Sequence, residues 1–353
     1  MSRARVARRI ATAAAYGGGG ISVLGGAAAG LIFTEMRYAR RRVGRAAAGE
    51  PPLTDGVYGT AFAACAGPPW RLAMLGDSTA AGLGVRRAGQ TPGALLASGL
   101  AAVSERPVEL HSVALPGAVS ADLERQVSLL LTEPGRAPVP DVSVIMIGAN
   151  DITGHVPPAR SVKHLAEAVA RLRTAGCQVV VGTCPDLGSV EPVGQPLRWV
   201  ARRLCRQLAA AQTIAVVELG GRTVSLGALL GPEFAANPRE LFGPDRYHPS
   251  AEGYQTAAMA ILPTLCAAVG AWPAEERDEA ARRERLLPVA DAAARAVTEG
   301  GTEVSAADSP TPDAGAGRRA LGAMLHRRRR RPLPAAEDAP PQEPARDTSP
   351  TCG

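Results

Sequence analysis

Aromatic residues make up only 3% of the 353 residues, and several common signature motifs are missing. There is no G-x-x-x-x-G-K-[ST] loop, and no G-x-G-x-x-G follows the first apolar run of the regular part. Both a P-loop nucleotide-binding protein and a dinucleotide-binding protein are therefore excluded. Basic residues interleaved with aromatic residues, which nucleic-acid recognition on a folded face would need, are also missing, so we expect no nucleic-acid partner.

Cysteine signatures are missing as well, although the chain has six cysteines. No pair has C-x-x-C spacing, and none stands near His at the spacing of zinc ligands. Cys177 and Cys184 bracket an apolar run and are expected to be ordinary strand-end residues. Neither a disulfide pairing nor the redox compartment follows from this pattern.

The net charge of +6 comes from arginine clusters near both ends of the chain. Residues 10–34 carry no charge, and a stretch of that length can span a bilayer. We predict a transmembrane or signal-anchor segment there, within a basic region of residues 1–45, and hence a membrane-anchored protein. A cleaved signal peptide or a Gly/Ala-rich leader is the alternative, giving a secreted or cytoplasmic protein. Arginines flank both sides, so the side of the membrane stays open.

The middle of the chain alternates between two patterns. Residues 46–69 are rich in Ala, Gly and Pro and are predicted to be a linker. Apolar runs then predict strands at 71–75, 108–115, 142–147, 178–183 and 214–219, and helical patterns lie at 92–104, 120–131, 159–175, 196–211 and 251–269. Alternating strands and helices predict a parallel sheet with helices on both faces. We expect one α/β domain over residues 70–270.

The composition changes after that domain. Residues 271–353 are predicted to be a charged, mostly disordered tail, with an exposed helix continuing to about residue 295. A polybasic island at 318–331 ends in five arginines. Its two interpretations are a solvated basic tail and a weak amphipathic segment for an anionic membrane surface.

The most informative stretch is residues 72–84, an apolar run that breaks at Gly76 and continues as Asp77-Ser78. A short apolar run ended by glycine is typical of a buried strand that feeds a turn. Ser78 would then sit just beyond the carboxyl end of a strand, where open α/β sheets place their sites. A serine there can act as a nucleophile with its own N–H aimed at the oxyanion. The alternative is a turn that only caps a helix.

A nucleophilic serine needs a base, and His248 is the best candidate among the five histidines. It stands in a loop that leads into the last predicted helix, three residues after Asp245. In a tight turn, this spacing lets the carboxylate accept a hydrogen bond from one imidazole nitrogen while the other faces outward. A turn that merely caps the helix is the competing interpretation.

Two further residues follow predicted strands on the same side of the sheet. Asn150 comes after the third strand, where its amide can donate a hydrogen bond to an oxyanion, although an Asx turn has the same pattern. Gly117 comes after the second strand and would let its N–H approach the same point, although a plain turn glycine is the alternative.

Taken in order, these motifs resemble the SGNH hydrolases, also called the GDSL-type esterase/lipase superfamily. The resemblance covers about residues 70–270. It is carried by Gly76-Asp77-Ser78, by Gly117, by Gly148-Ala149-Asn150-Asp151 and by Asp245-Arg246-Tyr247-His248-Pro249. The second of these blocks departs from the family pattern, because Leu115-Pro116 precedes Gly117 where many members are more polar.

The resemblance implies a flavodoxin-like three-layer α/β/α sandwich with a five-stranded parallel sheet, and ester hydrolysis through an acyl-enzyme. Ser78 would be the nucleophile, His248 the base and then the acid, and Asp245 the residue that orients His248. The oxyanion hole would consist of the Ser78 and Gly117 N–H groups and the Asn150 side chain. No metal or cofactor is implied, and Asp77 and Asp151 are expected to be structural.

Substrate and partners stay open at this point. Residues 184–195 and 225–244 are expected to line the acyl pocket, and a simple carboxylic ester, an acetylated sugar or a lipid would each be compatible with it. An acyltransferase using the same site is an alternative. So is a membrane-associated binding or scaffold protein that keeps the fold without the activity. The oligomeric state is not indicated.

Overall fold

The computed structural model describes residues 34, 49–63, 67–131, 139–190, 194–271, 289–298 and 303–305. All of them belong to the first of two units of the chain, Met1–Ala306. Apart from Thr34, the predicted membrane segment lies outside the described residues, as does the polybasic island, so both remain predictions. None of the helices described is both long enough and apolar enough to cross a membrane.

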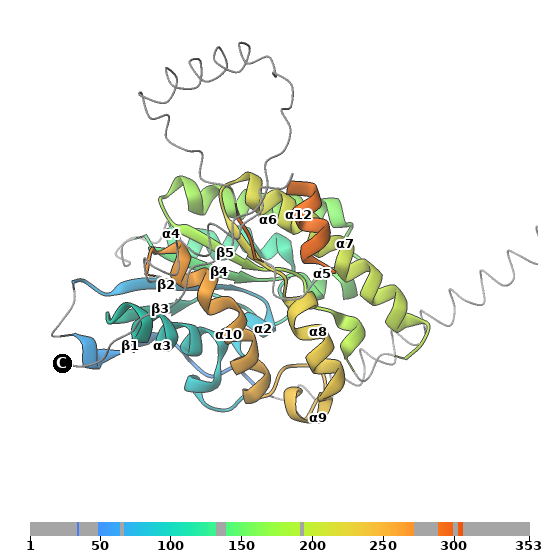
Figure 1. Cartoon of the computed structure of the whole chain (residues 1–353), viewed down its shortest axis with the longest axis horizontal. Coiled ribbons are helices and arrows are strands. Elements are labelled where there is room, and N and C mark those ends of the chain that lie inside the picture. The colour runs from blue at the N-terminus through green and yellow to red at the C-terminus, as the bar shows by residue number, and fades with distance from the viewer. Residues whose placement is uncertain are drawn as a thin grey trace, which may run out of the picture. The chain divides into compact units, whose positions relative to one another are not determined.

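A seven-stranded sheet forms the middle layer of the fold (Figure 1). In chain order the strands are β1 Gly56–Tyr58, β2 Trp70–Gly76, β3 Val108–Ser112, β4 Val142–Met146, β5 Gln178–Gly182, β6 Arg222–Val224 and β7 Glu303–Ser305. Their order across the sheet is β1-β3-β2-β4-β5-β6-β7. The five inner strands are mutually parallel and in the flavodoxin-like order, while β1 and β7 pair antiparallel at the edges.

The predicted α/β class and parallel sheet are confirmed, but the predicted count of five strands is wrong. The two additional strands lie in the segments predicted to be a linker and a disordered tail. Each has three residues, and the burial pattern of β1 is mostly exposed. A short edge strand has too few residues to produce the apolar run on which the prediction depended.

Helices cover both faces of the sheet (Figure 1). The main helices are α3 Pro92–Ser104, α4 Leu123–Leu131, α6 Pro158–Thr174, α7 Leu197–Glu218, α8 Leu226–Ala236, α10 Ala251–Ala268 and α12 Val289–Ala296. Side chains of α3 and α10 pack with Leu72 and Met74 on one face. Those of α4, α6 and the end of α7 pack with Ala73 and Leu75 on the other. Because β2 is buried on both faces, it reads as a continuous apolar run.

One predicted strand is wrong in kind. Residues 214–218 belong to α7, which ends at Glu218 with Leu219 as its C-cap, and the strand follows at Arg222–Val224. The run is rich in β-branched residues, but buried residues recur at helical spacing through Leu208, Gln212 and Val216. Helical packing against the sheet therefore overrides the local strand preference.

The described cysteines, Cys177, Cys184, Cys205 and Cys266, are buried free thiols. A hydrogen bond with Cys205 and burial raise the pKa of Cys184 well above its usual value, so that thiol stays protonated. Cys65 and Cys352 lie outside the described residues.

Candidate active site

Ser78 lies at the topological switch point of the sheet. Strand β2 has β3 on one side and β4 on the other, and the chain leaves it at Gly76. The short helix α2, Ser78–Ala81, begins two residues later, with the Asp77 side chain accepting a hydrogen bond from the Thr79 N–H at 2.9 Å. The Ser78 N–H, in the first turn, has no acceptor within the helix, which leaves it available to a ligand.

Gly76 lets this turn pass close to the neighbouring strand. Its φ is 131°, and a Cβ built on it would lie 1.9 Å from the Met146 carbonyl oxygen, so no other residue fits. The buried Gln126 side chain accepts from the Gly76 N–H and donates to its carbonyl oxygen, both at 2.8 Å. These contacts fix the start of the turn that carries Ser78.

His248 connects Ser78 to Asp245. Its Nε2 lies 3.0 Å from the Ser78 Oγ, and its Nδ1 lies 2.5 Å from the Asp245 Oδ2. The other carboxylate oxygen of Asp245 accepts from the backbone N–H groups of Tyr247 and His248, each at 3.0 Å. His248 is only 4% exposed, and Ser78 8%. The structure thus brings three sequence-predicted residues into one hydrogen-bonded chain.

The loop that holds His248 is itself fixed at both ends. The Gly243 N–H donates to the His248 carbonyl oxygen at 2.8 Å. Ser250 then caps α10 by accepting from the Gly253 N–H at 3.1 Å. From α10, the buried Tyr254 hydroxyl donates to the Leu83 carbonyl oxygen at 2.7 Å, which ties the loop after Ser78 to this helix.

The groups around Asp245 favour its deprotonated form. Burial alone would raise the pKa of Asp245, but hydrogen bonds from His248 and from the Tyr247 N–H, with the charge of the imidazole, together lower it. The Tyr247 ring packs edge-on against the imidazole, with centroids 4.9 Å apart. Burial raises the pKa of Tyr247, so its phenol stays neutral beside His248.

Asp77 behaves differently from Asp245. It is 2% exposed, and burial raises its pKa from 3.8 to about 6 in the fold, despite the hydrogen bond from the Thr79 N–H. A carboxyl that protonates more readily in the folded state stabilises the fold at low pH, and the stabilisation is lost as pH rises through the folded pKa.

We therefore expect Asp77→Asn, which keeps the helix-capping oxygen, to gain stability over the wild type as pH rises from 4 to 7. The gain should approach about 3 kcal/mol, from 1.36 kcal/mol for each pKa unit between 3.8 and about 6. Urea unfolding of both proteins at several pH values measures it. A difference in unfolding free energy that does not change between pH 4 and 7 would contradict the buried, proton-binding Asp77.

Gly117 and Asn150 lie beside each other on the same edge of the sheet. The Leu115 N–H donates to the Gly76 carbonyl oxygen at 3.0 Å, which brings the turn after β3 to the end of β2. The Asn150 amide, in the short helix α5 Ala149–Thr153, donates to the Ala118 carbonyl oxygen at 3.0 Å. Gly117 itself is exposed, with a left-handed φ of 82°.

Asp151 holds the turn after Gly117 in place. It is fully buried, and its two carboxylate oxygens accept from the Ser120 N–H at 3.2 and 3.0 Å. The carboxylate thus holds the turn after Gly117 against α5. This contact agrees with the structural role expected for Asp151 from the sequence.

A largely apolar cavity opens beside Ser78. Both segments expected to line an acyl pocket contribute to it: Pro185, Asp186, Leu187, Ser189 and Val190 from one, and Leu226, Leu230, Gly231, Phe234 and Phe242 from the other. Met146 at the end of β4 and Ala257 on α10 also line it, and both lie outside the two segments predicted from the sequence. Neither Gly117 nor Asn150 is part of this lining.

Two buried glutamines position the site and were missed from the sequence. Gln126 holds Gly76, as described, and Gln212 accepts from the Cys184 N–H at 2.8 Å and donates to the Ile147 carbonyl oxygen at 3.1 Å. Gln212 therefore ties the ends of β4 and β5 together. The signal in the sequence is a glutamine on the apolar face of an amphipathic helix, where a buried amide must find partners.

Within the described part of the chain, no group of three or more His, Cys, Asp or Glu side chains is placed to hold a metal ion.

The GDSL-like Lipase/Acylhydrolase family matches residues 74–256 of this chain. The chain belongs to that family. It is 42% identical over 266 residues to the GDSL-like esterase Rv1075c of Mycobacterium tuberculosis, covering 72% of this chain and 82% of that protein. The resemblance inferred from the sequence is confirmed. This chain is an ester-hydrolysing enzyme of the GDSL-like family.

Solved structures similar to this GDSL-like chain have lower identity. One is Axe2, an acetylxylan esterase from Geobacillus stearothermophilus, with 20% identity, 58% of this chain and 96% of that chain covered, and a TM-score of 0.45. Another is LAE5, an α/β hydrolase enzyme from the metagenome of Lake Arreo, Spain, with 21% identity, 58% and 97% covered, and a TM-score of 0.43.

Proposed function

We propose that this protein hydrolyses carboxylic esters through an acyl-enzyme formed on Ser78. The observation that carries the proposal is the chain of contacts from the Ser78 Oγ through the His248 imidazole to the Asp245 carboxylate, with distances of 3.0 and 2.5 Å. A nucleophile, a base and a group that orients the base are the parts that serine acyl transfer requires.

In the proposed mechanism, the His248 Nε2 takes the Ser78 hydroxyl proton as the Oγ attacks the ester carbonyl carbon. The Asp245 carboxylate holds the Nδ1–H and stabilises the imidazolium that forms. The tetrahedral intermediate collapses as His248 gives its proton to the leaving alcohol. Water then attacks the acyl-serine by the same steps, which release the acid and restore the Ser78 hydroxyl.

The negative charge of the intermediate would be met by the N–H groups of Ser78 and Gly117 and by the Asn150 amide. Asn150 has two N–H bonds, and the hydrogen bond to Ala118 uses one of them, which orients the other. Helix α5 and the buried Asp151 hold Asn150 and the Gly117 turn together, so these donors are organised before the substrate arrives.

Replacing Asn150 by Ala is expected to lower kcat for p-nitrophenyl butyrate about a hundred- to a thousand-fold, because one oxyanion donor is lost. KM should change little, since the donor acts on the intermediate rather than on the ground state. Steady-state kinetics measure both values. Asn237→Ala, a matched change at the C-terminus of α8, is the control; a similar loss in both variants would contradict the role of Asn150.

The cavity beside Ser78 supports an apolar acyl group as the substrate class. Most of its lining is apolar, and Met146 and Leu226 in that lining belong to the hydrophobic core. The full chain should therefore turn over p-nitrophenyl esters with acyl chains longer than acetate more efficiently, gaining from each buried methylene. A protein that only keeps the fold would hydrolyse none of the series.

Filling part of the cavity should shorten the preferred acyl chain. Ala257→Leu is expected to lower kcat/KM for the longer esters roughly tenfold relative to acetate, because the added methylenes occupy space for about two acyl methylenes. Ala260→Leu places the same side chain on α10 outside the cavity lining and should keep the wild-type profile. The proposed acyl site is wrong if the two variants have the same chain-length profile.

A further inference from the structure

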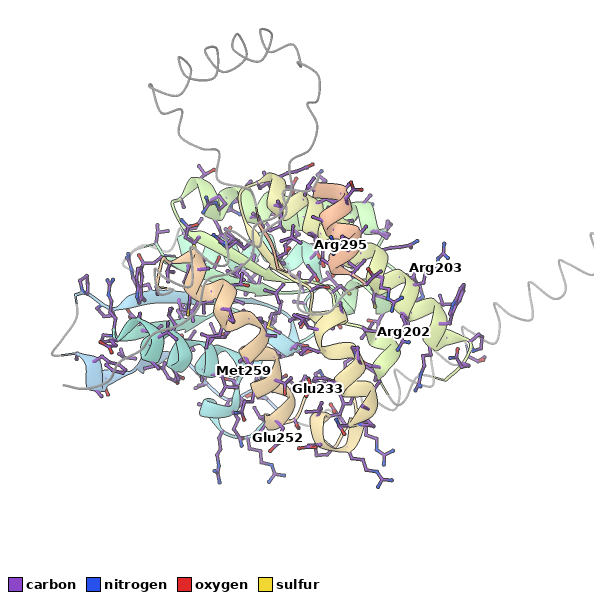
Figure 2. The ribbon with its side chains drawn as sticks, viewed as in Figure 1. Arg202, Arg203, Glu233, Glu252, Met259 and Arg295 are labelled. Carbon is purple, nitrogen blue, oxygen red and sulfur yellow. The ribbon has the colours of Figure 1, made fainter. Side chains whose placement is uncertain are left out.

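The first half of α7 presents a basic and apolar face to solvent. Trp199 is 62% exposed, and Arg203 and Arg206 are exposed beside it. The Arg203 guanidinium lies 6.0 Å from the Trp199 ring centroid. Arg203 projects outward from the helix (Figure 2). We refer to Trp199, Arg203 and Arg206 as the α7 face.

This face carries charge of one sign only. From Leu197 to Val217 the helix has four arginines, Arg198, Arg202, Arg203 and Arg206, and no acidic residue before Glu218. A solvated helix surface usually mixes both signs, and a large tryptophan is seldom this exposed on a monomer. The burial of the opposite side, at Ala201, Cys205 and Leu208, accounts for the packing of α7 but not for its outward face.

We propose that the α7 face docks on an anionic lipid bilayer. A Trp side chain suits the boundary between headgroups and acyl chains, and arginines extend from the same level to lipid phosphates. Trp199 and Arg203 stand one helical turn apart, as do Arg203 and Arg206, so one stripe of the helix presents both kinds of group.

The α7 face adjoins the loop that lines the cavity. Arg202 on the same helix forms an ion pair with Asp186, with Nε and Oδ2 2.9 Å apart. A Cβ built on Gly188 would lie 3.0 Å from the Arg198 carbonyl oxygen and from the Arg202 Cβ, so this loop packs directly on α7. Its neighbours Leu187 and Val190 line the cavity beside Ser78.

Docking would therefore place the cavity next to the lipid surface, where apolar esters concentrate. This consequence rests on the proposed function, whereas the docking itself does not. The two can fail separately, because docking is measured with lipids and hydrolysis with a soluble ester.

The test uses the full chain with vesicles that contain dibrominated phosphatidylcholine, which quenches tryptophan at bilayer depth. The vesicles carry either one quarter phosphatidylglycerol or phosphatidylcholine alone. The protein has three tryptophans, so the wild-type signal minus that of Trp199→Phe reports Trp199. This difference is insensitive to any other segment that holds the chain on the vesicle.

We expect quenching of the Trp199 signal on the anionic vesicles, and its loss on neutral vesicles or in 0.5 M NaCl. Arg203→Glu with Arg206→Glu should weaken anionic binding of this face by at least roughly fivefold per arginine. The matched control, Arg125→Glu with Arg160→Glu, makes the same charge change at exposed positions on α4 and α6. Its Trp199 signal should be quenched as strongly as that of the wild type.

Two outcomes would overturn the docking proposal. One is a Trp199 signal that anionic lipid does not quench. The other is that the α7 variant and the α4 and α6 control lose Trp199 quenching on anionic vesicles to the same extent, which would show a general charge effect. Hydrolysis of p-nitrophenyl butyrate without vesicles should be the same in all of these variants. Quenching without hydrolysis would overturn the proposed function and leave the docking in place.

Discussion

Replacing Ser78 by Ala is expected to lower kcat for p-nitrophenyl esters at least about ten-thousand-fold, the largest effect of any single change. The Oγ is the only atom of the proposed site that forms a bond to the substrate, and its hydrogen bond to the His248 Nε2 is 3.0 Å long. Without it, only the oxyanion donors and the cavity remain, and they cannot form an acyl-enzyme. Steady-state and single-turnover kinetics of the two proteins measure the difference.

The control for this prediction is Ser189→Ala. Ser189 also lines the cavity, but its hydroxyl donates to the Asp186 carbonyl oxygen at 2.7 Å and has no imidazole beside it. Its loss should change kcat by less than about threefold, while the Ser78 variant keeps the wild-type unfolding midpoint. If Ser78→Ala retained activity within tenfold of the wild type, the nucleophile would have to be sought elsewhere.

Replacing Asp245 by Asn should lower kcat about ten-thousand-fold near neutral pH, with little change in the fold. The Asn oxygen can still accept from the Tyr247 and His248 N–H groups, as the Asp245 Oδ1 does now. The amide nitrogen would face the His248 Nδ1, however, and donate to it. The neutral imidazole would then carry its proton on Nε2, where it cannot accept the Ser78 proton.

The activity of the wild type at mildly acidic pH and a matched control variant test the role of the Asp245 carboxylate. Hydrogen bonds and the imidazole charge lower the Asp245 pKa against the effect of burial, so the carboxylate remains ionised through mildly acidic pH and the wild type should lose no activity through Asp245 there. The matched change Asp122→Asn affects a carboxylate that accepts from the Val119 N–H at 2.8 Å, and it should leave kcat unchanged. An Asp245→Asn enzyme with more than a tenth of wild-type kcat would contradict the assigned orientation of His248.

Much of the fold could be predicted because the inner strands carry their own signal. The run from Leu72 to Leu75 is apolar on both faces, since helices cover both sides, and Gly76 ends it where a Cβ would collide with the Met146 carbonyl. Residues just beyond such ends, Ser78 and Asn150, could therefore be placed on one edge of the sheet. The spacing of Asp245 and His248 allowed a contact between carboxylate and imidazole but also a turn that only caps a helix, and the resemblance to the SGNH hydrolases favoured the contact.

Other features depend on contacts between distant segments. Strand β1 pairs with β3 and β7 with β6, and their three residues each contain no pattern beyond that pairing. The end of α7 was mistaken for a strand because its β-branched residues outweigh the helical spacing in a short window. The roles of Gln126 and Gln212 follow from which carbonyl and N–H groups they meet, and a sequence does not show these partners.

Covalent labelling by a fluorophosphonate, which traps an activated serine, tests whether Ser78 is the nucleophile. The full chain is treated with the probe, and intact-mass and peptide mass spectrometry locate the adduct. We expect one adduct per chain, on Ser78, which is absent from Ser78→Ala and forms much more slowly in Asp245→Asn. An adduct on another serine, or ester turnover by a chain that takes up no probe, would contradict it.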